Sequence, residues 1–488
     1  MWLQNATSPT DFTAMQWRVV RDADSSGVVE MVAQPHCIDI VDAEHRGFDG
    51  RDVAGTLAWG AKPAYGHGNS LESKDQTAAT MIDRTALKVS HPVKTAFDIV
   101  VDIPLRDLEE DPYPFYGWMR EECPVVYVPE TGRVWLMTWE LVKEAGANDA
   151  VFGPTKEAHE LVYGRGNVMS LTGAQHRVIR NAANHPVRPK QVNRYYETGI
   201  RANAQKYLHN VRPRGAADAT ADIFEPLSQR VVGDVLGFSD VDDTVLGRWF
   251  HALAAYLVDY GRDAAVAEQS RVVKAEIREY LEGRLPQLSA APDHTALSHL
   301  LHDGMPEGEL RSIEEMLPTV GVLIVGGFQE PAHLIASTLF ALLTHPEQAR
   351  LLVDDPVRWA RPAVEEALRW LPPFGMTEKL TTADVHVGGV LIPAGTEVSM
   401  VIGSANRDPA RFDRPDEFDI ARTDQDNVSF GFGGHFCIGH NVARALGEVV
   451  LAETFQTLPN LRLVPDNPPV VHGWLTRAPK SLPVRWDV

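Results

Sequence analysis

The chain has 488 residues, of which 44% are hydrophobic, and this is ample for a large buried core. Its 66 acidic and 46 basic residues give a formal net charge of -20, so electrostatic repulsion argues against nucleic acids and anionic membranes as partners. The three cysteines, Cys37, Cys123 and Cys437, lie far apart without a CxxC pair, which argues against a disulfide framework and favours a reducing cytosol.

The first part of the chain reads differently from the rest. Residues 1–80 lack sustained helical periodicity and contain glycine-bearing turns, such as the one at residues 61–69. We expect this stretch to be an extension that is poorly ordered or not part of the native protein, with Met81 as an alternative start. A small folded subdomain is the other interpretation. Residues 81–488 are expected to form a single domain.

No segment of the sequence suggests insertion into a membrane. The longest apolar runs, such as residues 320–325, are too short to span a bilayer. The N-terminus also lacks the charged and then apolar pattern of a signal peptide. We therefore expect a cytoplasmic protein that binds neither membranes nor nucleic acid.

Regular patterns begin after residue 95. Residues 112–120 fit a short amphipathic helix. Residues 124–128 and 134–137 alternate as the two strands of a hairpin, with a turn at residues 130–132.

The second half of the chain is dominated by helical periods. These run from about residue 190 to residue 350, and residues 385–392, followed by a turn at 393–395, read as a second hairpin. The predicted fold class is therefore mainly α with small β-sheets.

A long apolar helical pattern occupies residues 316–335. The glycine pair Gly326 and Gly327 would let a flat ring or a small molecule come close to its backbone. Pro331 removes one helical hydrogen bond and is expected to bend or loosen the helix.

A glycine-rich stretch at residues 429–439 leads into a helical pattern at residues 441–451. Cys437 lies just before that helix, where the helix dipole and free backbone N–H groups stabilise a thiolate. Gly431 and Gly439 allow the backbone to turn tightly and to approach a flat ligand closely. The pattern indicates a metal-binding thiolate.

The spacing Phe430-x-x-Gly433-x-His435-x-Cys437-x-Gly439 resembles the haem-binding signature of the bacterial cytochromes P450. The resemblance implies haem b as the cofactor and Cys437 as the axial ligand of its iron. It also implies the fold of that family, a triangular prism of helices around the haem. Phe430 would shield the sulfur from water.

Glu366 and Arg369 lie three residues apart on an amphipathic helical pattern and can form an ion pair. About seventy residues before Cys437, they resemble the structural ExxR pair of the family. The family often adds an arginine to this pair, but Glu417 stands at that position here. Arg407 or Arg422 could replace it, and the sequence leaves this choice open.

Four basic side chains are candidates for holding the haem propionates. His176 and Arg180 lie one helical turn apart and resemble the family's His-x-x-x-Arg pair, while an ordinary exposed basic face is the alternative. His435 belongs to the signature, and Lys379 lies where many relatives carry arginine. A buried dianionic edge needs such partners because unpaired buried charge is very unfavourable.

Gln329 and Glu330 stand where the family usually has an acid–threonine pair. We expect one of them to order water near the iron and to relay protons to reduced dioxygen. The alternative is that both only satisfy the backbone opened by Pro331.

The segments at 297–306, 326–331, 336–339, 472–477 and 481–486 resemble bacterial P450s that O-demethylate guaiacol-type methoxyphenols. The expected substrate pocket differs from theirs, because Tyr163 and Leu257 replace phenylalanines. The full set of pocket candidates is Tyr163, Leu257, Val322, Phe374, Met376 and Thr377.

The resemblance implies a monooxygenase that uses dioxygen on a small, aromatic substrate, by hydroxylation or aryl-ether O-demethylation. The chain contains no flavin or iron–sulfur motif, so electrons would come from a separate protein, a ferredoxin or a flavin/iron–sulfur reductase. The alternatives are a peroxide-driven peroxygenase, a non-catalytic haem protein, and a zinc site built from His435, Cys437 and His440, whose close spacing fits a tetrahedron poorly.

Overall fold

The computed structural model describes five segments of the chain: residues 17–21, 29–33, 86–90, 93–259 and 263–488. The chain divides into two units, residues 1–82 with 259–263, and residues 83–258 with 264–488. In the first unit, β1 (Trp17–Arg21) and β2 (Val29–Ala33) pair as an antiparallel ladder. The rest of the expected extension, residues 1–80, lies outside the described residues, and its disorder stays a prediction.

The second unit is mainly helical, as the sequence predicted. Its α-helices are α2 (Leu105–Glu110), α3 (Tyr113–Glu122), α4 (Trp139–Ala147), α5 (Lys156–Tyr163), α6 (Gly173–Asn184), α7 (Pro189–Tyr195), α8 (Ala202–Val211), α9 (Glu225–Leu236), α10 (Asp243–Leu257), α11 (Ala264–Ala290), α12 (Ala296–His302), α13 (Ile313–Phe328), α14 (Glu330–Thr344), α15 (Pro346–Asp354), α16 (Pro356–Trp370), α17 (Ile402–Ala405) and α18 (His440–Thr457). Short 3-10 or π turns are η2 (Ala96–Asp98), η3 (His185–Val187), η4 (Tyr196–Arg201), η5 (Arg212–Arg214), η6 (Ala219–Phe224) and η7 (Gly433–His435). The helix expected at residues 112–120 is α3.

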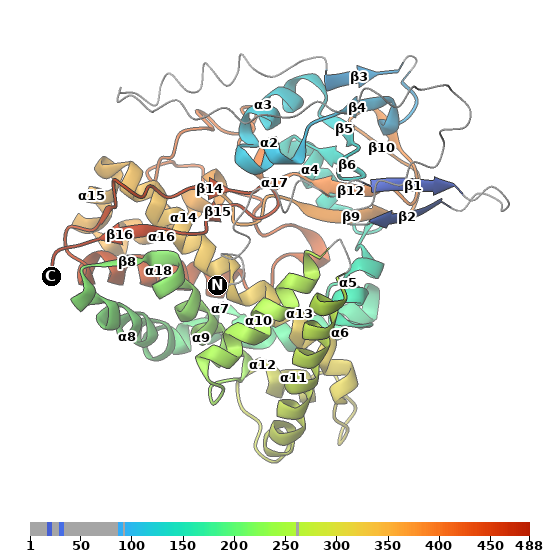
Figure 1. Cartoon of the computed structure of the whole chain (residues 1–488). Helices are drawn as coiled ribbons and strands as arrows, with labels where there is room; N and C mark the ends of the chain where they lie inside the picture. Colours follow the sequence, from blue (N-terminus) through green and yellow to red (C-terminus); the bar gives the residue numbers. More distant parts are fainter. Residues whose placement is uncertain (1–16, 22–28, 34–85, 91–92, 260–262) are drawn as a thin grey trace, which may run out of the picture. The chain divides into compact units, whose positions relative to one another are not determined.

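The strands of this unit form one larger sheet and several small ones. They are β3 (Leu87–Val89), β4 (Ile99–Val101), β5 (Val125–Val128), β6 (Arg133–Leu136), β7 (Phe152–Gly153), β8 (Ala216–Asp218), β9 (Thr377–Thr381), β10 (Val385–Val387), β11 (Val390–Ile392), β12 (Glu397–Met400), β13 (Arg462–Leu463), β14 (Val471–His472), β15 (Ala478–Pro479) and β16 (Pro483–Arg485). The larger sheet has seven strands in the order β3-β4-β5-β6-β12-β9-β7. Within this unit, Figure 1 shows its strands gathered at one end and helices α8 to α12 at the other.

Both predicted hairpins are confirmed. β5 and β6 pair antiparallel, with Val126 opposite Trp135, and apolar side chains on both faces of the hairpin are buried. β10 and β11 pair antiparallel through a two-residue turn, in which Gly388 (φ 56°) and Gly389 (φ 80°) adopt the left-handed conformation that suits such a turn.

The apolar pattern at 316–335 forms two helices instead of one. α13 begins with a capping box, in which Ser312 and Glu315 exchange hydrogen bonds, and it ends at Phe328. α14 begins at Glu330, because Pro331 has no N–H to continue the helical ladder. The disturbance predicted at Pro331 is therefore an interruption of the helix at a single residue, Gln329.

Together α13 and α14 make a stretch, Ile313–Thr344, that is long and apolar enough to cross a membrane by length and composition. The expectation that every apolar run is too short to span a bilayer is wrong for this stretch. Because 67% of its most apolar window is buried inside the protein, packing in the core accounts for its composition.

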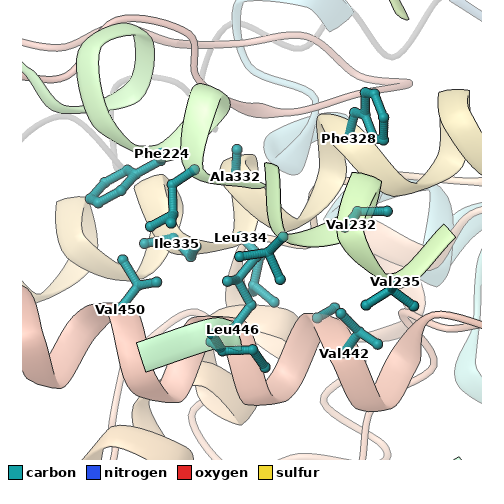
Figure 2. Close-up of a cluster of buried hydrophobic side chains, with 14 of the residues drawn as sticks. Phe224, Val232, Val235, Phe328, Ala332, Leu334, Ile335, Val442, Leu446 and Val450 are labelled. Atoms are coloured by element: carbon teal, nitrogen blue, oxygen red, sulfur yellow. The ribbon is translucent and has the colours of Figure 1, made fainter. Parts of the chain in front are cut away.

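A cluster of buried side chains fixes α14 against α9 and α18. Figure 2 shows Ile335 on α14 between Phe224 of η6 and Val450 on α18, with Val232 of α9 nearer to Phe328 and with Leu446 on α18 below Leu334. Leu446 and Val450 are completely buried. This cluster anchors the helix that follows Cys437 to the helix that follows Gln329.

We expect Leu446→Ala to lower the free energy of unfolding by about 2–5 kcal/mol, because it deletes buried methyl groups and leaves a cavity. Urea unfolding followed by far-ultraviolet circular dichroism measures the change. Val357→Ala is the control, since Val357 is 91% exposed and should unfold as the wild type does. Equal midpoints for the two variants would contradict the assignment of Leu446 to the core.

Candidate functional site

The loop that carries Cys437 is closed by its own backbone. The Cys437 N–H donates to the Phe430 carbonyl at 2.8 Å, and the Gly439 N–H donates to the Cys437 sulfur. Gly431 (φ 72°) and Gly433 (φ 63°) take the left-handed conformation that the tight path requires. The sulfur therefore lies at the N-terminal end of α18.

The surroundings of Cys437 suit a thiolate that binds a metal. Burial raises the pKa of the thiol, while the Gly439 N–H and the charge of Arg180 act in the opposite direction. Even with the Gly439 N–H and the charge of Arg180 nearby, a buried thiol stays protonated unless a cation binds to it. A metal ion that binds to the sulfur deprotonates it. The N–H donation would also limit how much electron density the sulfur gives to that metal.

Aromatic rings and a cation surround the loop on its outer side. The Phe430 and Phe436 ring centroids lie 6.4 Å apart, and the Arg444 guanidinium lies 4.4 Å from the centroid of Phe430. These side chains restrict access of water to the sulfur.

The four predicted propionate partners come from three elements and lie close together. The rings of His176 on α6 and His435 in the cysteine loop stack with centroids 4.3 Å apart. Arg180, one turn further along α6, donates to the Phe436 carbonyl. Lys379 on β9 is buried, and its Nζ lies 3.4 Å from Asp149 Oδ1.

Two nitrogens in this cluster are buried without a hydrogen-bond partner: His176 Nε2 and His435 Nδ1. Burial first, and then neighbouring cations, lowers the pKa of His176, and the same causes lower the pKa of His435 to about 4. Buried polar groups are rarely left unpaired, and buried like charges repel. The cluster therefore fits a ligand that brings negative charge and hydrogen-bond acceptors.

Asp149 is a member of this cluster that the sequence did not reveal. Its Oδ2 accepts a hydrogen bond from the Gly434 N–H at 2.7 Å while Oδ1 faces Lys379. It follows α4, 285 positions before Gly434, and nothing in its local sequence marks it. It holds the first turn of the cysteine loop in place.

The two glycines of α13 face different neighbours. A Cβ on Gly326 would meet nothing within 4 Å, and Gly326 is exposed although it lies in the middle of a core helix. A Cβ on Gly327 would lie 2.7 Å from Val232 Cγ1 on α9. Open space therefore borders the backbone at Gly326, whereas Gly327 is required by helix packing.

Glu330 lies at the break between α13 and α14, one helical turn after Gly326. Its Oε2 is buried without a partner, and burial raises its pKa to about 7. Its charge is close enough to Cys437 and Tyr163 to raise the pKa of both groups, after the larger effect of burial. The carboxyl group is therefore poised between its two protonation states near neutral pH.

Gln329 contributes its backbone to the break. Its carbonyl accepts the His333 N–H at 2.9 Å, and its φ of -95° and ψ of -47° stay in the right-handed helical region, so α13 and α14 join without strain. Among the described residues, its side chain forms no hydrogen bond.

We expect Glu330→Gln to stabilise the protein more at about pH 8 than at about pH 5. The folded state raises the carboxyl pKa from the ordinary value of 4.5 to about 7, so ionisation opposes folding above pH 7. That penalty fades as the pH falls from 7 towards 4.5, and it is at most about 3 kcal/mol. Urea unfolding of both proteins at the two pH values measures it; a difference independent of pH would contradict a buried, titrating carboxyl.

The predicted pocket residues lie on several elements. Tyr163 ends α5 and packs on α13, with its Cδ1 3.5 Å from where a Cβ on Gly321 would lie. Met376 is fully buried, and Thr377 Oγ1 is buried without a partner. Leu257 ends α10 and is 37% exposed. Val322 on α13 and Phe374, which bridges to Thr476, are half-buried.

Glu366 and Arg369 are completely buried and form a bidentate ion pair with two N–O distances of 2.8 Å. Arg422 is the third member, with its Nε 3.4 Å from Glu366 Oε1. Arg407, the other candidate, instead donates to the Trp370 carbonyl at 2.6 Å. The structure therefore selects Arg422 over Arg407 as the third member of the buried cluster, a choice that the sequence left open.

Among the described residues, no three His, Cys, Asp or Glu side chains converge as ligands of a metal ion. A zinc site at His435, Cys437 and His440 therefore has no ligand set there. The thiol, the cation cluster with unpartnered nitrogens and the open face at Gly326 instead fit haem, which brings an iron for sulfur, two carboxylates and a flat ring.

The comparisons with known proteins agree with this fit. A family model described as Cytochrome P450 matches residues 360–475. Nocardicin C N-oxygenase of Nocardia uniformis is 31% identical over 394 residues, which cover 77% of this chain and 96% of the relative. Cytochrome P450 CYP107DY1 of Priestia megaterium is 31% identical over 319 residues, covering 65% of this chain and 76% of the relative.

Solved structures share the fold. The P450 enzyme CYP109B1 of Bacillus subtilis superposes with a TM-score of 0.69 at 26% identity, covering 77% of this chain and all of that structure. The chain therefore belongs to the cytochrome P450 family, with the fold, the haem b cofactor and the monooxygenase chemistry of these oxidoreductases.

Proposed function

We propose that this monooxygenase oxidises a small aromatic substrate, with removal of an aryl methyl ether as its preferred reaction. The Gly326–Pro331 segment, with its Gln-Glu-Pro end, supports the proposal through its resemblance to P450s that demethylate methoxyphenols. The observation that carries it furthest is the position of Tyr163 and Glu330. The charge of Glu330 raises the pKa of both Tyr163 and Cys437, so Glu330 lies near both groups, and a polar aromatic ligand beside it would find a carboxyl and a hydroxyl.

The roles proposed for this chain's residues follow from those positions. Cys437 binds the iron, and His176, Arg180, His435 and Lys379 bind the carboxylates of the cofactor. Haem held by a thiolate supplies the reductive activation of dioxygen and the insertion of one oxygen atom into a C–H bond. Insertion into an aryl methoxyl gives a hemiacetal, which releases a phenol and formaldehyde, while two electrons and two protons convert the second oxygen atom to water.

Glu330 is proposed to hold and deliver protons. Its carboxyl has a pKa near the working pH, which is the condition for efficient proton transfer in both directions. Gln329 is proposed to hold the break open through its backbone, so that Glu330 faces the cofactor side. Val322, Phe374, Met376 and Thr377 are proposed to complete the pocket wall, with Leu257 at its rim.

The electrons are proposed to come from a separate ferredoxin or flavin/iron–sulfur reductase, because three scattered cysteines cannot hold an iron–sulfur cluster. We also propose that residues 81–488 are the catalytic domain and that the enzyme works in the cytoplasm. The burial of α13 and α14 in the core supports that location.

Titration of the haem protein with guaiacols, methoxybenzoates and unmethylated aromatics tests the substrate class. Ligands of the proposed class should displace iron-bound water and change the spin state in the visible spectrum. Turnover with a bacterial reductase should then release formaldehyde and phenol in equal amounts. A panel in which aliphatic or steroidal ligands bind and methoxyaromatics do not would overturn the proposal.

Tyr163→Phe is the matched pocket variant. Among the described residues, the Tyr163 hydroxyl donates to no partner, so it is free for a substrate oxygen. Loss of one such hydrogen bond should weaken binding of hydroxylated or carboxylated aromatics about tenfold. Binding of the corresponding unsubstituted anisole should not change.

A peroxide-driven reaction is the second candidate, because an unpartnered carboxyl at Glu330 can move a proton between the two oxygens of hydrogen peroxide. The net reaction joins substrate and peroxide to hydroxylated product and water. Omitting the reductase and adding peroxide distinguishes the two. Activity with peroxide that disappears in Glu330→Gln would favour the peroxygenase.

A further inference from the structure

A polar stripe runs along α14, starting from Glu330. Glu330, His333 and Ser337 are spaced by three and four residues, so they share one helix face. The residues beside them on α14, such as Ala332 and Leu334, belong to the apolar cluster of Figure 2. Polar groups inside such a helix are unfavourable unless they have partners.

The stripe has fewer direct partners than its burial demands. His333 is 3% exposed, and its Nε2 lies 4.0 Å from Glu225 Oε1, which is too far for a hydrogen bond. Glu330 Oε2 and Ser337 Oγ are buried without partners, and so is Ser228 Oγ, one turn after Glu225 on α9. Unpaired buried polar atoms on helices that pack against each other, as α9 and α14 do, are typical of places filled by internal water.

The stripe also reaches the surface. The Glu225 side chain is 24% exposed, whereas that of His333 is 4% exposed. Burial raises the pKa of Glu225, and Asp218 adds to that effect. Burial, assisted by the charge of Lys480, lowers the pKa of His333 to about 4. A neutral imidazole has one nitrogen that donates and one that accepts, so it can pass a proton on without keeping a charge.

We propose that Glu225 and His333, bridged by internal water, form the route by which protons from solvent reach Glu330. A proton on the Glu225 carboxyl passes through water to one nitrogen of His333. The other ring nitrogen releases its proton through water to the Glu330 carboxylate, and a ring flip or reverse tautomer shift resets the imidazole. This proposal rests on the proposed role of Glu330 as the proton holder. In this proposal Glu225 and His333 act on the reaction only through Glu330.

Hydrogen–deuterium exchange at Glu330 tests the route without substrate, reductant or turnover. The ferric holoenzyme is held at about pH 6, where the Glu330 carboxyl is mostly protonated, and its C=O band is assigned by the infrared difference from Glu330→Gln. Rapid dilution into deuterated buffer then gives the exchange rate. We expect His333→Leu to slow exchange by at least an order of magnitude and Glu225→Gln to slow it measurably.

Thr338→Val is the matched control. Thr338 is buried on the same helix, but its Oγ1 donates to the Leu334 carbonyl at 2.7 Å and it lies off the stripe. In this variant the Glu330 carboxyl should exchange its proton at the wild-type rate. If His333→Leu does not fold, His333→Gln keeps a polar group of similar size, and Glu225→Gln changes a partly exposed residue, so either can replace it.

The outcomes separate the two proposals. Wild-type exchange rates in the His333 and Glu225 variants would overturn the route and leave Glu330 as proton holder. Equal slowing in Thr338→Val would overturn it as well, because a general tightening of the helix would explain the data. A wild-type spectrum without a Glu330 band would remove the proton-holding role and the route together.

Discussion

Replacing Cys437 by alanine is expected to abolish monooxygenase activity to the limit of detection and to remove the red-shifted Soret band of the reduced carbon monoxide adduct. The sulfur lies at the start of α18 and accepts the Gly439 N–H, and it is the side chain proposed to bind the iron, so its removal takes away the thiolate ligand. Thiolate donation to the iron is what drives cleavage of dioxygen. Absorption spectra of freshly prepared protein measure the change.

Cys123→Ala is the matched control. Cys123 caps α3, is 3% exposed, and burial raises its pKa to about 12, so it behaves as an inert apolar side chain. Its replacement should leave the spectrum and the activity intact. A Cys437→Ala protein that keeps the red-shifted band would show that another residue binds the iron, and the reading of the whole site would have to change.

Replacing Arg369 by methionine is expected to lower the free energy of unfolding by about 3–5 kcal/mol, because the buried Glu366 carboxylate loses its bidentate partner and keeps only Arg422, at 3.4 Å. Arg369 also donates to the carbonyls of Asn406, Pro415 and Glu417, which would lose that partner. A typical domain is stable by only about 5–15 kcal/mol. We therefore expect little folded, haem-containing protein, measured by urea midpoint and by the haem content of the soluble fraction.

Two further variants make this result specific. Arg271→Met breaks an exposed pair, Arg271–Glu268, with the same three-residue spacing, and it should unfold as the wild type does. The double variant with Glu366→Leu removes both buried charges and should recover part of the loss. A single Arg369→Met variant as stable as Arg271→Met would contradict a structural role for the buried pair.

The parts of the site that the sequence could predict are those encoded within a few residues. The cysteine loop combines a thiol, glycines and a following helix in one short segment, and His176 with Arg180 needs only helical spacing. Asp149 and Arg422 were different. Each meets its partner only because β9, the cysteine loop and the segment after α17 fold together, so no local pattern identifies them.

The helical core shows the same limit. Periodicity predicted an apolar helix at 316–335, and Pro331 predicted a disturbance, but not that the helix ends at Phe328 and restarts at Glu330. The same periodicity could not assign different roles to Gly326 and Gly327. Adjacent residues of a helix point in different directions, but what each one faces depends on the neighbouring helices. The packing of Val232 against Gly327 decides it.

The break at Gln329 has a consequence for how such an enzyme can adapt. α14 is fixed by apolar contacts to α9 and α18, whereas Gly326 on α13 borders open space. Because α13 also packs on α9 through Gly327, the open space at Gly326 lies in a fixed framework on the ligand-facing side of the break. Substitutions at Gly326 can therefore change which molecules fit, while the scaffold that positions the sulfur stays constant.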